Sequence, residues 1–448
     1  MGRKSHTRAL SIWANGVRVG VWRIPARGDM ELHYDAAWKQ SAAGRPLSLS
    51  LPFGIGDAPL RGERVNHYFD NLLPDSDAIR RRLAARFGAA TLDPFDLLAA
   101  VGRDCVGAVQ LLGEDDMPAG YDRIDGTALS DGDVERLLDQ ASGAAAGLRG
   151  DDGDDDDFRL SLAGAQEKTA LLRHGGRWMR PHGATPTTHI LKLPLGFVGN
   201  KRADLTTSVE NEWLCLAILR AFGLPVADAE IATFGAHKVL SVARFDRALH
   251  RDGRWLMRLP QEDFCQALGV PPHLKYEAHG GPGVPDLVDI LRRSEVADAD
   301  LDTLFAALIV FWMLAAPDGH AKNFSLRLLP GGRFRLTPLY DVMSIWPVEG
   351  DGANQWSWHK AKLAMAVHGK RKHYAMRDIT RRHFSAMAEQ CGLGDIATPI
   401  VERLAAATPR VIDTVGARLP RGFPSRIAER IFGGLTRAAE RLDTPLAR

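Results

Sequence analysis

The chain has 448 residues, of which 45% are hydrophobic and 25% are charged, and its net charge is +2 at pH 7. This composition is typical of a soluble globular protein, the length predicts two or three domains, and the balanced charge gives no general sign of nucleic-acid binding. No apolar run reaches the roughly 18 residues of a membrane span, and the polar N-terminus does not resemble a signal peptide, so we expect a cytoplasmic location.

The first domain is expected to span residues 1–115 and to be a small α+β unit. Two β-rich runs are joined by Asn15-Gly16, a dipeptide that accepts the positive φ angles of a type I′ turn, which predicts a hairpin. The runs are Ala9–Ala14 and Val17–Trp22. Alternating apolar and hydroxyl residues then predict a strand over Pro46–Leu51, and apolar spacing predicts helix between Phe69 and Phe87.

An acidic and glycine-rich stretch, residues 116–157, follows and is interpreted as a connection between domains. It ends in the run 151–157, where six of seven residues are aspartates. These like charges repel one another and favour a solvated segment. Because consecutive side chains point in different directions, the run offers no preformed cage for a metal. Its role stays open.

The rest of the chain is strand-rich up to about residue 250 and mainly helical beyond it. In residues 158–250 we predict strands and one helix, and in residues 251–448 a long buried helix and an extended segment. The predicted strands are Thr169–Leu172, His189–Leu193 and Val239–Phe245, the helices Val209–Phe222 and Leu301–Ala316, and the extended segment Phe334–Tyr340. Three amphipathic helices are predicted near the C-terminus. This order is expected of a two-lobed kinase whose nucleotide lies between a small and a large lobe.

The strongest chemical signal is the segment Asp318–Asn323, with Asp341 following 18 residues after Asn323. Phosphoryl transfer needs a carboxylate that orients or deprotonates the attacking hydroxyl, and it needs oxygen ligands for magnesium. The spacing predicts Asp318 as the catalytic carboxylate and Asn323 and Asp341 as metal ligands, while Lys322 would steady the phosphate. A surface turn is the alternative, since Asp-Gly is common in turns, but the apolar helix before it and the second aspartate favour catalysis.

A cation for the nucleotide phosphates is predicted at Lys192, which stands in an otherwise apolar strand. A buried ammonium needs an anion, and the candidates on the next helix are Glu210 and Glu212, between which the sequence does not decide. The turn Ser161–Lys168 contains Gly164, and its backbone amides would cradle phosphates as a nest. Neither GxGxxG nor GxxxxGK[ST] occurs, which disfavours a P-loop NTPase.

Several segments form an ordered set of motifs along nearly the whole chain. In the N-terminal part they are Arg45–Pro52, Phe69–Asp75 and Val101–Ala108. In the remainder they are Ser161–Lys168, Leu259–Asp263, Lys275–Glu277, Gly280–Gly283 and Asp318–Asn323. Together they resemble the HipA family of toxin kinases, and the ordered set is far more specific than any single string.

The resemblance implies an α+β, protein-kinase-like two-lobed fold, with an appended N-terminal α/β subdomain and a helix-rich C-terminal lobe. It implies a serine/threonine kinase that uses ATP and Mg²⁺, with Asp318 as catalytic carboxylate. The residues that the resemblance places around ATP and its metal are Ala163, Gly164, Ala165, Gln166, Glu167, Lys168, Lys192, Ala243, Arg244, Phe245, Asp318, His320, Lys322, Asn323 and Asp341. Asn323 and Asp341 are the implied metal ligands.

The resemblance also implies regulation and partners. In the family the serine corresponding to Ser161 is autophosphorylated, and the roughly two added negative charges would expel the phosphate loop from the ATP site. Family members act on glutamyl-tRNA synthetase and are neutralised by a HipB-type antitoxin dimer that binds operator DNA. A group of basic residues is predicted to contact DNA phosphates, namely Lys370, Arg371, Lys372 and Arg382. The alternative interpretation is that these side chains form an ordinary solvent-exposed surface.

The sequence differs in two features, one from ordinary protein kinases and one from the family motif at Ser161–Lys168. Asp341 is followed by Val-Met instead of Phe-Gly, so regulation by a flipping phenylalanine is not expected. The aspartate run before Ser161 lies outside the motif. Two other functions stay open: a kinase of the same fold acting on a small molecule or lipid, and a binding-only repressor subunit with a vestigial site.

Overall fold

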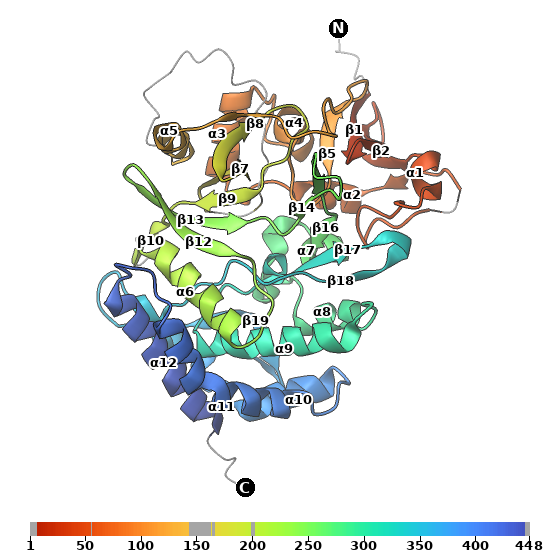
Figure 1. Ribbon diagram of the computed structural model, residues 1–448. Coiled ribbons are helices and arrows are strands. Elements are labelled where there is room, and N and C mark those ends of the chain that lie inside the picture. Colours follow the sequence, from red (N-terminus) through yellow and green to blue (C-terminus); the bar gives the residue numbers. More distant parts are fainter. Residues whose placement is uncertain (1–6, 55, 143–162, 164–165, 199–201, 444–448) are drawn as a thin grey trace.

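The computed structural model describes residues 7–54, 56–142, 163, 166–198 and 202–443. An N-terminal region and a sheet-based small lobe occupy the upper part of Figure 1, and a mainly helical large lobe lies below them. The structure is thus of the mixed α and β class that we expected. None of the described helices is both long enough and apolar enough to cross a membrane.

The N-terminal region is built on an antiparallel sheet in the order β4-β3-β2-β1-β5. Its strands are β1 (Arg8–Ala14), β2 (Val17–Ile24), β3 (Glu31–Tyr34), β4 (Leu60–Arg61) and β5 (Gln110–Gly113), and its helices are α1 (Ala36–Gln40), α2 (Glu63–Asp70), α3 (Asp77–Phe87) and α4 (Pro94–Val101). Asn15 and Gly16, with φ angles of 51° and 79°, connect β1 to β2 and confirm the hairpin. Trp22 stacks on Phe69 at 4.0 Å between ring centroids, which fixes α2 against the sheet.

The strand predicted over Pro46–Leu51 is wrong, because this segment pairs with no strand of the described chain. The hydroxyls of Ser48 and Ser50 instead donate to the carbonyl oxygen of Gln266 in the large lobe, at 3.1 and 2.6 Å. The alternation of apolar and hydroxyl residues therefore reflects an irregular segment that packs on the large lobe. An alternating pattern alone does not distinguish such packing from the pairing of a β-strand.

The small lobe is an antiparallel sheet in the order β12-β13-β9-β7-β8-β6. The predicted strands and helix are confirmed as β7 (Lys168–His174), β9 (His189–Lys192), β13 (His237–Ala243) and α6 (Ser208–Ala221). The sequence did not predict β6 (Gly126–Ala128), α5 (Asp131–Ala141), β8 (Arg177–Pro181), β12 (Ala229–Phe234) or the antiparallel pairs β10 (Gly196–Val198)–β11 (Ala203–Leu205) and β14 (Arg247–Leu249)–β15 (Leu256–Arg258). β6 and α5 come from the stretch interpreted as a connection, and a capping box between Ser130 and Asp133 begins α5.

The large lobe surrounds α9 (Ala297–Met313), the predicted buried helix. Around it are β16 (Gln261–Asp263), α7 (Phe264–Leu268), α8 (Val284–Leu291), β17 (Ser325–Leu328), β18 (Phe334–Leu336), β19 (Lys362–His368), β20 (Lys372–Ala375), α10 (Arg381–Gln390), α11 (Ala397–Gly416) and α12 (Ser425–Asp443). The last three confirm the predicted C-terminal helices, and they lie at the bottom of Figure 1. Because α9 is apolar on nearly every side near its end, it is stable only when enclosed in this way.

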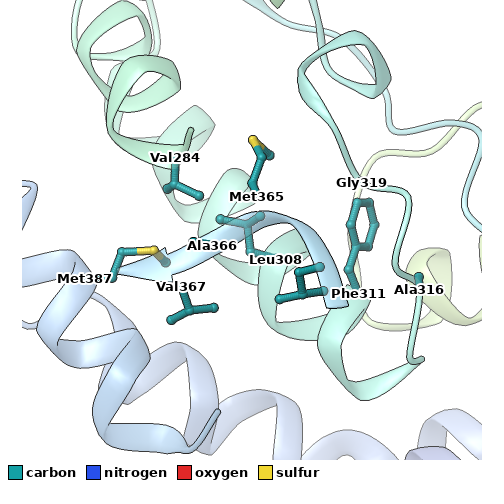
Figure 2. A pocket seen from close by; sticks show the side chains of 10 residues that line it. Val284, Leu308, Phe311, Ala316, Gly319, Met365, Ala366, Val367 and Met387 are labelled. Atoms are coloured by element: carbon teal, nitrogen blue, oxygen red, sulfur yellow. The ribbon is translucent and has the colours of Figure 1, made fainter. Parts of the chain in front are cut away.

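The loop after α9 packs tightly on the core that carries it. Figure 2 shows the small apolar pocket beside this loop, where Phe311 of α9 lies next to Gly319. A Cβ atom at position 319 would lie only 2.7 Å from Cδ2 of Phe311. Glycine is therefore required for close contact between the loop and α9, and this contact sets the position of the neighbouring Asp318.

Candidate active site

A cavity of about 560 Å³ lies between the small lobe and the large lobe, and residues of the N-terminal region close one side of it. Most of the predicted nucleotide-site residues line it, although they come from distant parts of the chain. They are Ala163, Gln166, Lys168, Lys192, Ala243, Arg244, Phe245, Asp318, His320, Lys322, Asn323 and Asp341. The volume is within the range of pockets that bind small molecules.

Lys192, the last residue of β9, lies in the cavity wall between two carboxylates. Its Nζ atom donates to Glu212 Oε1 at 2.7 Å and to Asp341 Oδ1 at 2.8 Å. Burial alone would lower the pKa of Lys192, but the Asp341 and Glu212 carboxylates outweigh it and raise the pKa. The lysine therefore stays charged and connects the two lobes. Glu210, the other candidate partner, is instead 2.6 Å from Nζ of Lys238.

Lys168 lies beside Lys192, because the two residues are direct cross-strand partners on β7 and β9. Burial and the neighbouring Lys192 lower the pKa of Lys168 to about 8. Its ammonium donates to the carbonyl oxygen of Ala163 and borders the cavity. Two adjacent lysines repel each other, and the Asp341 and Glu212 carboxylates offset only part of this repulsion, since the pKa of Lys168 stays below its ordinary value. An anionic phosphate at this wall of the cavity would relieve the remainder.

Asp318 and Asn323 face the lysines from the loop after α9. Although the Asp318 side chain is 55% exposed, it lies within the cavity, where enclosure by protein and the Asp341 carboxylate raise its pKa to about 6 against the lowering effect of a hydrogen bond from Tyr276. The amide nitrogen of Asn323 donates to the backbone oxygens of Asp318 and Asp341, at 2.9 and 3.3 Å. Asn323 thus joins the two segments that carry the carboxylates.

A magnesium ion suits the donor set of Asn323 and Asp341. Since the Asn323 nitrogen is used in hydrogen bonds, its Oδ1 atom is the one that would coordinate a metal. Burial would raise the pKa of Asp341, but Lys192 and Lys168 lower it, so the carboxylate is ionised. The described residues contain no group of three or more His, Cys, Asp or Glu side chains arranged for a metal. Mg²⁺ held by one or two protein oxygens, water and phosphate needs no such group.

Lys322 lines the cavity and also contacts the N-terminal region, while its predicted contact with the transferred phosphate stays a prediction. Its Nζ atom donates to Asn71 Oδ1 at 2.8 Å and lies 3.5 Å from carboxylate oxygens of both Asp75 and Asp263. Asp75 also accepts from Lys275 at 2.7 Å. Asn71, Asp75 and Lys275 lie in segments that carry family motifs, but the motifs alone predicted no role for these side chains.

Arg244 lines the cavity, yet its guanidinium is directed away into a buried ion cluster with Asp104 and Asp246. The side chain of Glu167 pairs with Arg82 at 2.6 Å and is absent from the cavity lining. Ser161, Gly164, Ala165 and the run 151–157 lie outside the described residues.

The predicted DNA-contacting group lies at the β19–β20 hairpin and on α10, and none of its residues lines the cavity. In this group Nζ of Lys372 pairs with Glu277 at 2.8 Å. Lys370, Arg371 and Arg382 are exposed. Contact with DNA stays a prediction.

Comparisons with known proteins identify the same family in the N-terminal region and in the two lobes. Residues 10–112 match the model of the HipA N-terminal domain, and residues 160–412 match that of the HipA-like C-terminal domain. The protein Y4mE of Sinorhizobium fredii, provisionally named a kinase, is 34% identical over 91% of this chain and 92% of its own length. The serine/threonine-protein kinase toxin HipA of Shewanella oneidensis is 27% identical over 92% of this chain and 90% of its own.

A solved structure extends the likeness to the fold. The Shewanella oneidensis toxin–antitoxin complex of HipA, HipB and operator DNA contains a chain that superposes with a TM-score of 0.76, at 22% identity, over 97% of both chains. The likeness covers the N-terminal region and both lobes. The solved structure shows the same fold, and the two domain models, with the relative at 34% identity, show that this chain belongs to the HipA family of kinases.

Proposed function

We propose that this protein is a serine/threonine protein kinase that transfers the γ-phosphate of ATP, with Mg²⁺, to a serine of a protein substrate. The observation that carries the proposal is the junction at Lys192, whose ammonium bonds to Glu212 of the small lobe and Asp341 of the large lobe. The two contacts support the proposal because they bring the ammonium that would bind phosphate next to the carboxylate that would bind the metal, and both groups line the cavity that also contains Asp318.

Each of these groups has a defined task in phosphoryl transfer. Lys192 and Lys168 bind the nucleotide phosphates, and Phe245, which packs on Tyr340 at 5.7 Å between ring centroids, borders the adenine. Arg244 contributes through its backbone, since its side chain is engaged in the ion cluster. Asp318, largely ionised at neutral pH, orients the acceptor hydroxyl and takes its proton. Mg²⁺ at Asn323 and Asp341 would neutralise charge on the phosphates.

We further propose that the chain is the toxin of a type II toxin–antitoxin pair. Its cognate antitoxin would be a HipB-type dimer, operator DNA would be contacted through the complex, and glutamyl-tRNA synthetase would be the substrate. Autophosphorylation at Ser161 would inactivate the kinase. Support comes from the toxin name of the Shewanella relative and from the solved complex of that family with HipB and DNA.

The test is incubation of the purified chain with γ-labelled ATP and magnesium. We expect label on the protein, its loss in Asp318→Asn and Asp341→Asn, and its retention in Asp413→Asn, a control at an exposed position of α11. Peptide mapping should locate the label at Ser161, and Ser161→Ala should remove it there. Full labelling of the Asp318 or Asp341 variant would refute the catalytic assignment.

The alternative, a small-molecule or lipid kinase, predicts a different product in the same reaction. Label would then appear in a low-molecular-weight or lipid fraction of an added cell extract, and the protein itself would stay unlabelled. Toxicity on expression adds a second readout, since the toxin proposal predicts that Asp318→Asn relieves growth arrest.

A further inference from the structure

The Asp318 carboxylate is held in place by Tyr276, a residue of the large lobe that lines the same cavity. The hydroxyl of Tyr276 donates to Asp318 Oδ1 at 2.7 Å. The other oxygen, Oδ2, is 4.0 Å from Nε2 of His320, which is beyond hydrogen-bonding distance. One carboxylate oxygen is therefore occupied, while the second remains available on the exposed side chain.

Tyr276 is itself fixed from several directions. Its ring meets the His320 ring edge to face, with 5.0 Å between centroids and an interplanar angle of 86°. Nζ of Lys275 lies 5.4 Å from the Tyr276 ring centroid and is bonded to Asp75 at 2.7 Å. The side chains of Lys275 and Asp75 are only 14% and 12% exposed, so this ion pair is shielded from solvent. The N-terminal region thus supports the segment that carries Tyr276.

We propose that Tyr276 is a positioning residue for phosphoryl transfer: its hydroxyl fixes the Asp318 carboxylate so that Oδ2 faces the acceptor hydroxyl, and Asp75 supports it through Lys275. This inference rests on the proposed function, in which Asp318 is the catalytic carboxylate. It also assigns the N-terminal region a direct part in forming the site, since Asp75 lies outside both kinase lobes.

The physical reason lies in the freedom of an aspartate side chain. The terminal torsion of aspartate is broad and roughly two-fold, so an unrestrained carboxylate presents its oxygens in many directions. A hydrogen bond to a charged group contributes enough to select one orientation, equivalent to roughly a 10- to 100-fold population difference. Losing the bond should therefore lower the rate at saturating ATP by about the same factor. Tyr276 lines the same cavity but forms no hydrogen bond with Lys192 or Asp341, so we expect ATP binding to be unchanged.

The experiment measures initial autophosphorylation rates of the full chain across a range of ATP concentrations. For Tyr276→Phe we expect roughly a 10-fold or greater fall in the maximal rate, with an unchanged ATP concentration at half-maximal rate and an unchanged melting temperature. Asp75→Asn should lower the maximal rate in the same manner. The double variant of Tyr276→Phe and Asp75→Asn should show a fall in maximal rate that is smaller than the product of the two single-variant falls. The matched control is Tyr121→Phe, since Tyr121 is 40% exposed and lies away from the cavity lining.

Different outcomes separate this inference from the proposed function. If Asp318→Asn labels as fast as the parent, the catalytic assignment itself fails. If Asp318→Asn is inactive but Tyr276→Phe has the parent maximal rate, only the positioning role is refuted. A Tyr276→Phe variant that loses ATP affinity or melting temperature in step with its rate would indicate a merely structural role and would also overturn the inference.

Discussion

Asp104 joins the N-terminal region to a buried cluster of Arg244, Arg247 and Arg258, and its removal is the clearest test of how this region is attached. The carboxylate, on a residue that is 7% exposed, accepts from Thr187 Oγ1 at 2.7 Å. It also accepts from Arg247 at 2.9 Å, from Arg258 at 3.2 Å and from Arg244 at 3.3 Å. Burial alone would raise the pKa of Asp104, but the three guanidinium groups hold it below its ordinary value.

The expected loss follows from the charge left behind in Asp104→Ala. The cluster holds three guanidinium groups and two carboxylates, the second being Asp246. Without Asp104, three buried cations would share a single carboxylate. Breaking a buried ion pair by removing one partner costs about 3–5 kcal/mol, a large fraction of the roughly 5–15 kcal/mol that stabilises a typical domain. Asp104→Asn keeps the volume, so it should recover part of the loss.

Urea unfolding followed by tryptophan fluorescence measures this loss, and limited proteolysis reports release of the N-terminal region. Asp104→Ala should lower the free energy of unfolding by about 3–5 kcal/mol and expose the N-terminal region to cleavage first. Asp122→Ala, at an exposed position, is the control and should match the parent. A change below about 1 kcal/mol in Asp104→Ala would show that the cluster does not hold the regions together.

Three further predictions concern Asp318, Glu262 and Gly319. Because enclosure within the cavity raises the pKa of Asp318 to about 6, the autophosphorylation rate should fall as pH drops through 6, whereas an ordinary aspartate would sustain it to about pH 4. Glu262 is fully buried, accepts from the Leu49 amide at 2.9 Å and has a pKa raised by burial to about 8. Its folded-state pKa exceeds the unfolded value, so its contribution to the free energy of unfolding is complete below about pH 4 and is lost as pH rises through 8. Glu262→Gln should therefore make the urea midpoint fall less steeply between pH 6 and 9. An unchanged slope of urea midpoint against pH would contradict this explanation. Gly319→Ala should cost about 1–3 kcal/mol of stability through its clash with Phe311, together with most of the autophosphorylation rate, and parent-like melting and rate would disprove the packing argument.

The sequence alone determined the features that depend on local order along the chain. The hairpin at Asn15-Gly16, the buried helix before Asp318 and the three C-terminal helices follow from turn chemistry and apolar periodicity, and the structure confirms them. The spacing of Asp318, Asn323 and Asp341 likewise predicted one cluster, and all three line a single cavity. Their roles, and the domain boundaries near residues 115 and 250, stay predictions.

Only the tertiary structure decided which distant groups meet. Glu210 and Glu212 are two positions apart on α6, roughly 200° around the helix, and both are buried, so no local pattern says which faces Lys192. The contacts of Lys322 with Asn71 and of Tyr276 with Asp318 join segments 251 and 42 residues apart. The first contact depends on how the N-terminal region packs on the large lobe, and the second on how segments within the large lobe pack. A periodic pattern reports only the face that is buried, never the partner that buries it.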